Sequence, residues 1–194
     1  MPVDPSEFHK LNVTDTCAVW NILSSKTLYE TAKAVGCNFS VTRFVYYECL
    51  LKRRSKMEIT DQELRSRLVA EREKGQFREY HLEIADLQDV EILEKRRNLG
   101  MGELSSIAFA RRTRQAFITD DQGARKLASE VMEHRKVQTT PHLFGWLIYN
   151  SFLSDRDKDV VLQEHLEVKG DISKYLQEIY ERALLYRLNS RKQH

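Results

Sequence analysis

Short apolar runs and stretches of helical periodicity alternate along the chain. The runs that predict β-strands are residues 11–14, 37–41, 116–119 and 136–139. Elsewhere, apolar residues recur at every third or fourth position, which is typical of amphipathic helices. These stretches lie near residues 18–23, 26–35, 42–51, 60–74, 103–110, 124–128, 141–152 and 172–184. The segment 77–93 fits a strand as well as the start of a helix.

Strands that alternate with helices predict an α/β fold. The sheet should be parallel and covered by helices on both faces, because right-handed crossovers build a doubly wound layer structure. Residues 116–119 form a compact apolar run between two helical stretches, as expected of a buried parallel strand. Among the helix ends, Thr16 is predicted to cap the first helix, Gly36 to end the second and Pro141 to open a later one.

The pattern divides the chain near residue 154. Residues 1–154 hold all the predicted strands, and a chain of 194 residues suits one domain with a short helical appendage. Residues 155–194 are highly charged, and apolar residues between Ile172 and Leu184 share one helical face. We therefore expect a helical C-terminal extension that packs on the domain or on a partner.

Composition narrows the class of protein. Hydrophobic residues make up 41% of the chain and charged residues 31%, which suits a folded core and excludes a disordered chain. No apolar stretch is long enough to span a bilayer, and residues 1–5 lack the basic and apolar regions of a signal peptide. The three cysteines have no zinc-ligand spacing. A soluble, cytoplasmic protein without membrane association is expected.

Acidic residues follow two of the predicted strands. Asp15 comes directly after the first strand, and Asp120 and Asp121 come directly after a later, buried one. Ligands of an open parallel sheet bind beyond the carboxyl ends of its strands, so these carboxylates should face one crevice. Glu48, on the helix after the second strand, and Glu103, at the start of another helix, can reach the same place. Each acid taken alone is equally explained as a surface charge or as a first-turn helix acid.

Carboxylates that gather in a half-buried cleft repel one another unless a cation neutralises them. A set of oxygen ligands without histidine or thiolate suits Mg²⁺ or Mn²⁺. Such an ion can activate water for attack on a phosphodiester and offset the charge that grows on the phosphate oxygens. The acids therefore predict hydrolytic, metal-dependent cleavage of a nucleic acid without a covalent enzyme intermediate.

Three motifs resemble those of the PIN-domain nucleases. Val13–Ala18 (Val-Thr-Asp-Thr-Cys-Ala) looks like the opening Asp-Thr-Ser of that family. Residues 100–108 are similar to its Gly-x-Gly-Glu followed by a helix of small residues, and residues 118–125 resemble its Thr-Asp-Asp strand exit. Glu48 falls where the family places a helical acid. The order and spacing match over about residues 11–140, whereas the later helices are not diagnostic.

The resemblance implies a Rossmann-like PIN fold and Mg²⁺- or Mn²⁺-dependent ribonuclease activity. Carried over by position, it makes catalytic, metal-binding acids of Asp15, Glu48, Glu103 and Asp121, a further metal ligand of Asp120, and a supporting hydroxyl of Thr119. It also implies a homodimer or, as for the bacterial toxins of the family, an antitoxin or other protein partner. Cys17 replaces the usual small hydroxyl residue, which puts one hydrogen bond to Asp15 in doubt.

Basic residues have to contact the substrate. The chain has 31 Lys and Arg against 29 Asp and Glu, so any preference for nucleic acid depends on local clusters. Arg43, on the helix of Glu48, and Arg125, just after the Asp pair, are the predicted phosphate contacts. Arg43 equally fits a helix ion pair with Glu48.

Three functions remain open at this point. The first is an endoribonuclease, either the toxin of a toxin–antitoxin pair or a component of RNA processing or defence. The second is a non-catalytic PIN-like module that binds RNA or a protein, although a complete acidic set argues against it. The third is the same chemistry directed at DNA.

Overall fold

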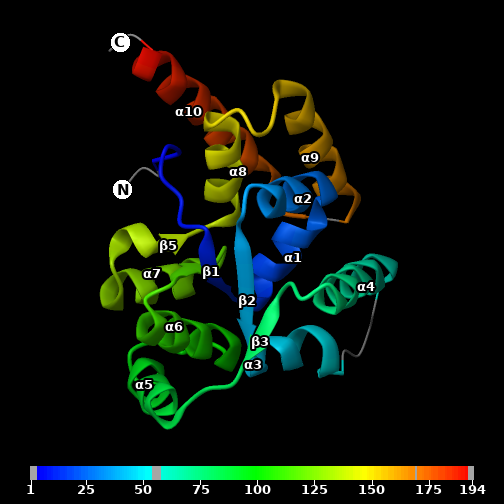
Figure 1. The fold of residues 1–194 in the computed structure, drawn as a ribbon. Helices are drawn as coiled ribbons and strands as arrows, with labels where there is room; N and C mark the ends of the chain where they lie inside the picture. Colours follow the sequence, from blue (N-terminus) through cyan, green and yellow to red (C-terminus); the bar gives the residue numbers. More distant parts are fainter. Residues whose placement is uncertain (1–3, 54–57, 169, 192–194) are drawn as a thin grey trace.

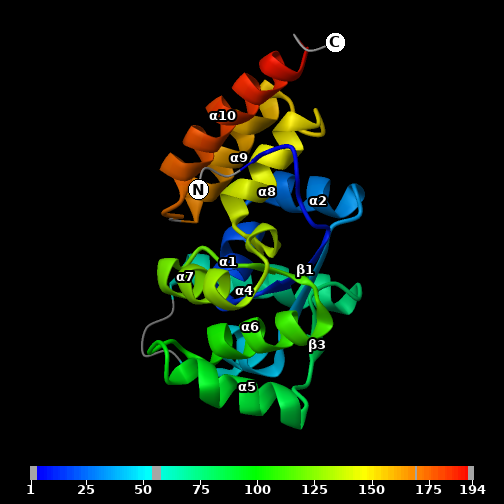
Figure 2. The same cartoon turned by 90° about the vertical axis from the view of Figure 1, so that its left-hand side faces the viewer.

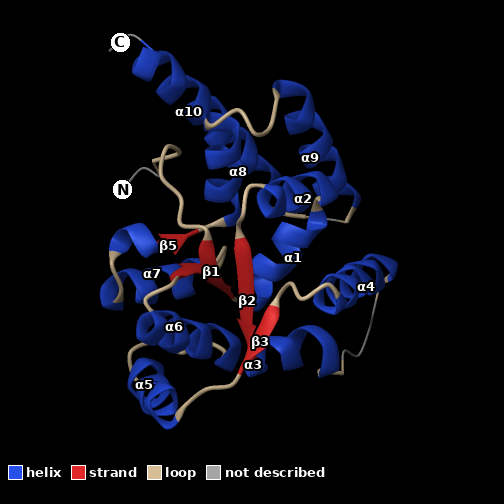
Figure 3. Ribbon diagram, viewed as in Figure 1, coloured by secondary structure: helices blue, strands red, loops and turns tan. Residues whose placement is uncertain are grey.

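In the computed structural model, which describes residues 4–53, 58–168 and 170–191, five short strands form one sheet (Figure 3). The strands are β1 (Leu11–Thr14), β2 (Asn38–Thr42), β3 (Arg78–Tyr80), β4 (Ala116–Ile118) and β5 (Val137–Gln138). Their order is β3-β2-β1-β4-β5, and every neighbouring pair is parallel. In the register of the central strand, Val13 lies opposite Ser40 of β2 and Phe117 of β4. The predicted α/β fold with a parallel sheet flanked by helices is confirmed.

Helices connect the strands and follow the last one (Figure 1). They are α1 (Thr16–Ser24), α2 (Lys26–Ala34), α3 (Arg43–Tyr46), α4 (Ile59–Glu73), α5 (Ile84–Glu94), α6 (Met101–Thr113), α7 (Gln122–Val131), α8 (Thr140–Tyr149), α9 (Asp155–Glu167) and α10 (Ser173–Arg191). A π-helix, η1 (Tyr47–Leu51), continues α3, and a 3₁₀ turn, η2 (His134–Lys136), precedes β5. No described helix combines the length and the apolar character that crossing a bilayer requires.

Two hydrophobic clusters cover the two faces of the sheet. Val13 and Phe117 belong to a cluster with α5, α6 and α7, whereas Phe39, Val41 and Ile118 belong to a larger one with α1, α2 and α8. Since successive side chains of a strand point to opposite faces, Phe117 and Ile118 contact different layers. The helices therefore form layers on either side of a central sheet.

The C-terminal helices α9 and α10 complete the larger cluster. Leu176, Ile179 and Ala183 of α10 are buried in the same core as α1 and α8. Both views show α10 alongside α8 at the end of the molecule away from α5 (Figures 1 and 2). The extension therefore packs on the rest of the chain and contributes to its core.

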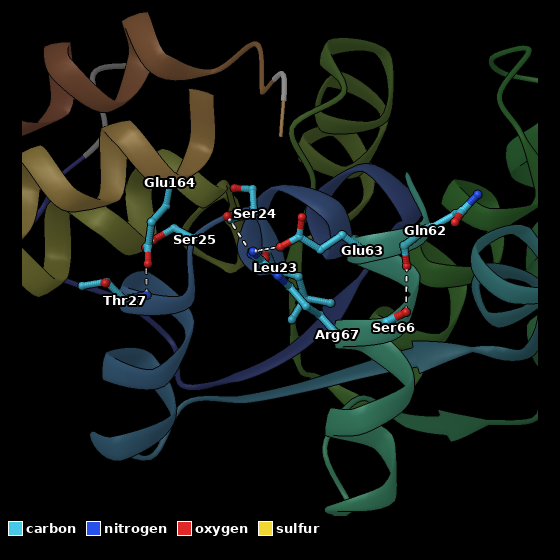
Figure 4. A network of polar contacts seen from close by, with 9 residues as sticks. All are labelled: Leu23, Ser24, Ser25, Thr27, Gln62, Glu63, Ser66, Arg67 and Glu164. Atoms are coloured by element: carbon cyan, nitrogen blue, oxygen red, sulfur yellow. Dashed lines mark hydrogen bonds and ion pairs between the residues drawn. The ribbon is translucent and has the colours of Figure 1, made fainter. Parts of the chain in front are cut away.

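Polar contacts fix α9 against the start of α2 (Figure 4). Glu164 Oε2 accepts hydrogen bonds from Ser25 Oγ at 2.6 Å and from the Thr27 amide at 3.0 Å. Beside it, the buried His165 ring contacts Ser24 Oγ through Nδ1 at 2.6 Å and accepts from the Ile172 amide through Nε2 at 3.2 Å. A carboxylate that accepts from an amide in the first turn of a helix also stabilises that helix electrostatically.

We expect Glu164→Ala to lower the free energy of unfolding by about 1 to 3 kcal/mol, because it leaves the buried Ser25 hydroxyl and a helix-start amide without their acceptor. Urea unfolding at pH 7 measures this. The matched control is Glu167→Ala, which removes an exposed carboxylate of the same helix that accepts only from Gln163 among the described residues. Equal unfolding midpoints for the two variants would contradict the anchoring role.

Some local predictions need correction. The cap of α1 is Asp15 and not Thr16, because the Asp15 carboxylate accepts from the Ala18 amide while Thr16 is already helical. The ambiguous segment 77–93 resolves into the edge strand β3 and helix α5. Helix α6 begins at Met101, before Glu103.

Candidate functional site

The five predicted acids lie at or beside the carboxyl edge of the sheet. Asp15 follows β1, and Asp120 and Asp121 follow β4, so the parallel strands deliver all three to the same edge. Glu48 is on the π-helix η1, and Glu103 is in the first turn of α6. Single-turn π-helices are frequent at functional sites, because they change the direction in which one side chain points.

Asp15 is the most deeply placed acid, with an exposed fraction of 0%. Its Oδ1 caps α1 by accepting from the Ala18 amide at 2.8 Å. Its Oδ2 is buried and has no hydrogen-bond partner among the described residues. A buried carboxylate oxygen without a partner is costly, so the cap alone does not account for this side chain.

Burial raises the pKa of Asp15 to about 8, and the nearby carboxylates of Asp120 and Glu103 raise it further. The Thr119 hydroxyl and the Ala18 amide favour the charged form, but they do not compensate. Without a cation, the ionised form of this side chain is therefore strongly disfavoured at neutral pH.

Glu48 lies against the start of α6. Its Oε1 accepts from the Gly102 amide at 3.2 Å, and its Oε2 accepts from the Thr16 hydroxyl. A Cβ at Gly102 would collide with this carboxylate, so the glycine allows the close approach. The half-buried Glu103 turns back over Gly100. Burial raises the pKa of Glu103, and the charges of Glu48 and Asp121 add to the rise.

The two aspartates after β4 have different surroundings. Asp120 is fixed through both oxygens, since Oδ2 accepts from Asn21 Nδ2 at 2.8 Å and Oδ1 from the Thr140 amide at 2.9 Å. Burial raises the pKa of Asp120, while its polar contacts and the Arg125 charge oppose the rise. Asp121 is exposed and caps α7, with Oδ1 accepting from the Ala124 amide at 2.7 Å.

The remaining residue of this loop that was singled out, Thr119, has a structural part as well. Its Oγ1 accepts from the Asp121 amide at 3.1 Å, and the residue is fully buried. The hydroxyl thus links the loop after β4 to the surroundings of Asp15.

The acids share one electrostatic environment without converging on a point. Burial and then the charges of Asp15, Asp120, Asp171 and Asp121 raise the pKa of Cys17 to about 12. Yet within the described parts of the chain, no three His, Cys, Asp or Glu side chains are grouped closely enough to hold a metal ion. The carboxylates instead point to helix-start amides and neighbouring polar groups.

Two polar residues of this edge were not foreseen. Thr16 donates to Glu48, and Asn21 donates to Asp120 across 99 residues of sequence. Asn21 also contacts Cys17 Sγ at 3.8 Å. The one available signal was a buried Asn inside the otherwise apolar sequence of α1.

The predicted phosphate contacts are placed differently. Arg43 forms an ion pair with Glu79 of β3 at 2.7 Å and not with Glu48. Arg72 binds the other oxygen of Glu79 at 3.0 Å and stacks over the Tyr46 ring, whose centroid is 3.9 Å away. Arg43 is therefore neutralised by an acid of its own sheet edge, which weakens its prediction as a phosphate contact. Arg125 has no such partner among the described residues.

No protein-family model, curated protein or solved structure matches this chain. The site geometry and the sequence motifs are therefore the basis on which a function is assigned.

Proposed function

We propose that this chain is a Mg²⁺- or Mn²⁺-dependent endoribonuclease of the PIN type. The observation that carries the proposal is the buried, unpartnered Oδ2 of Asp15 beside further acids at the carboxyl edge of the sheet. An arrangement of this kind is expensive unless a cation offsets it, and an all-oxygen set of ligands fits a hard divalent ion.

Asp15, Glu48, Glu103 and Asp121 would hold the ion, and each would have to turn from its present contacts toward the others. When bound, a divalent ion supplies Lewis-acid activation of the scissile phosphate and of water. Asp120, fixed by Asn21 and the Thr140 amide, would keep the loop after β4 in position. The Thr119 hydroxyl would orient Asp15 from behind.

The test is an assay of the full chain on labelled single-stranded RNA and on DNA of the same sequence. We expect cleavage of RNA with millimolar Mg²⁺ or Mn²⁺ and none in EDTA. We also expect each ion to raise the melting temperature, because binding only to the folded state stabilises it. Cleavage of DNA with RNA left intact would redirect the proposal to a DNA nuclease, and unchanged cleavage in EDTA would exclude the mechanism.

A second function is favoured by one observation, the lack of a converged metal-binding group among the described residues. A PIN-like module that binds RNA or a protein without cutting would need no such group. Its signature is RNA binding that neither ion affects, together with a melting temperature that is the same in EDTA and in Mn²⁺.

A further inference from the structure

A groove of about 930 Å³ opens between α7 and α10, directly beside the acidic edge. Of the five site acids, it is Asp120 that lines this groove. Helix α7 contributes Arg125 and Lys126, and α10 contributes Tyr175 and Arg182. Figure 2 shows the first turns of α10 facing α7 across the molecule. The C-terminal extension thus forms one wall of a groove whose other wall carries the loop of the candidate site.

The acids of the groove other than Asp120 are already paired. Glu130 accepts from Arg97 at 3.3 Å, and Glu178 lies 3.9 Å from the Lys174 ammonium. Each of these two carboxylates therefore has a cation of its own, and neither leaves a net negative charge on the walls.

Three cations of the groove have no ion-pair partner among the described residues: Arg125, Lys126 and Arg182. Arg125 is the one nearest to the site, since its charge acts on Asp120. Lys126 is exposed on α7, and Arg182 is half-buried on α10. Unpaired cations on two facing walls suit an extended anion such as a phosphodiester backbone.

Tyr175 adds an aromatic surface to the same groove. It is 57% exposed on the first turns of α10, and it has no ring contact among the described residues. Exposed aromatic rings beside cationic side chains are the means by which proteins stack unpaired bases while they hold the backbone. The groove has the volume of a large ligand pocket, which suits one strand with splayed bases and leaves no room for a duplex.

We propose that this groove binds single-stranded RNA beside the scissile bond and that α10 supplies half of the contacts. Arg125 and Lys126 hold phosphates on one wall, Arg182 holds a phosphate on the other, and Tyr175 stacks a base. The inference rests on the proposed function for its substrate class, but it assigns the C-terminal extension a role that the acidic site does not require.

Binding is measured in EDTA, which prevents metal-dependent cleavage, by fluorescence anisotropy of a labelled oligouridine. We expect Arg182→Glu and Lys126→Glu each to weaken binding by about tenfold or more, with a flatter dependence of the logarithm of affinity on that of salt by roughly 0.7 per lost phosphate contact. Tyr175→Ala is expected to weaken binding by about tenfold with little change in salt dependence. The control is Arg156→Glu, the same charge change on the exposed first turn of α9, outside the groove.

The outcomes separate this inference from the nuclease assignment. Binding lost in the groove variants but kept in Arg156→Glu supports the groove, even if no RNA is ever cut. Equal weakening by Arg156→Glu, or wild-type affinity in Arg182→Glu and Lys126→Glu, overturns it, even if the acids do cut RNA. Tighter binding of a duplex than of the single strand overturns the assigned substrate class.

Discussion

Asp15→Asn and Asp121→Asn are each expected to reduce metal-dependent RNA cleavage by at least about a hundredfold, since loss of even an outer-shell partner of a metal site commonly costs 10- to 100-fold. Asn keeps the size of the side chain and its ability to cap a helix, so α1 and α7 should still form. The change removes a charged oxygen that a cation needs. Initial rates under saturating Mn²⁺, with far-ultraviolet circular dichroism to verify folding, measure the effect.

The control for these variants is Asp159→Asn, which neutralises an exposed acid of α9 that pairs only with Lys158 in the described structure. It should cleave at the wild-type rate. Folded Asp15→Asn and Asp121→Asn proteins that both cut RNA as fast as this control would remove the acids from the mechanism.

Asp15 is also expected to make the metal-free protein less stable as the pH rises. The unfolded chain releases this proton near the ordinary pKa of 3.8, whereas the folded protein keeps it until about pH 8. Over that window the unfolded state binds fewer protons, so the free energy of unfolding falls with pH. By pH 8 the Asp15→Asn variant should exceed the wild type in stability by roughly 2 to 5 kcal/mol, since one pKa unit corresponds to about 1.4 kcal/mol.

Urea unfolding in EDTA at pH 4, 6 and 8 measures this difference, which should be small at pH 4 and grow with pH. Added Mn²⁺ should then stabilise the wild type at pH 8 and leave Asp15→Asn almost unchanged. Parallel stability curves for the two proteins would mean that the Asp15 carboxyl ionises without penalty, and the argument for a cation at this position would lose its basis.

The sheet could be predicted from the sequence because its central strands are buried on both faces and therefore appear as apolar runs. The edge strand β3, with the sequence Arg-Glu-Tyr, has no such pattern and stayed ambiguous. The π-helix that carries Glu48 was also missed, because a single wide turn hardly changes the periodicity of apolar residues.

The candidate site was predictable in position and not in contacts. Parallel strands deliver their following residues to one edge, which placed Asp15 beside Asp120 from topology alone. Which groups each carboxylate contacts depends on side-chain directions: Asn21 reaches Asp120, and Arg43 turns to Glu79 instead of Glu48. No spacing along the chain contains that information.

The burial of α10 against α1 and α8 sets the order in which the molecule can be completed during synthesis. Leu176, Ile179 and Ala183 close a core whose other members belong to the first half of the chain. A nascent polypeptide cannot bury those early apolar faces until its last helix has left the ribosome. Premature termination before residue 173 would therefore release a product with an open core instead of a smaller working protein.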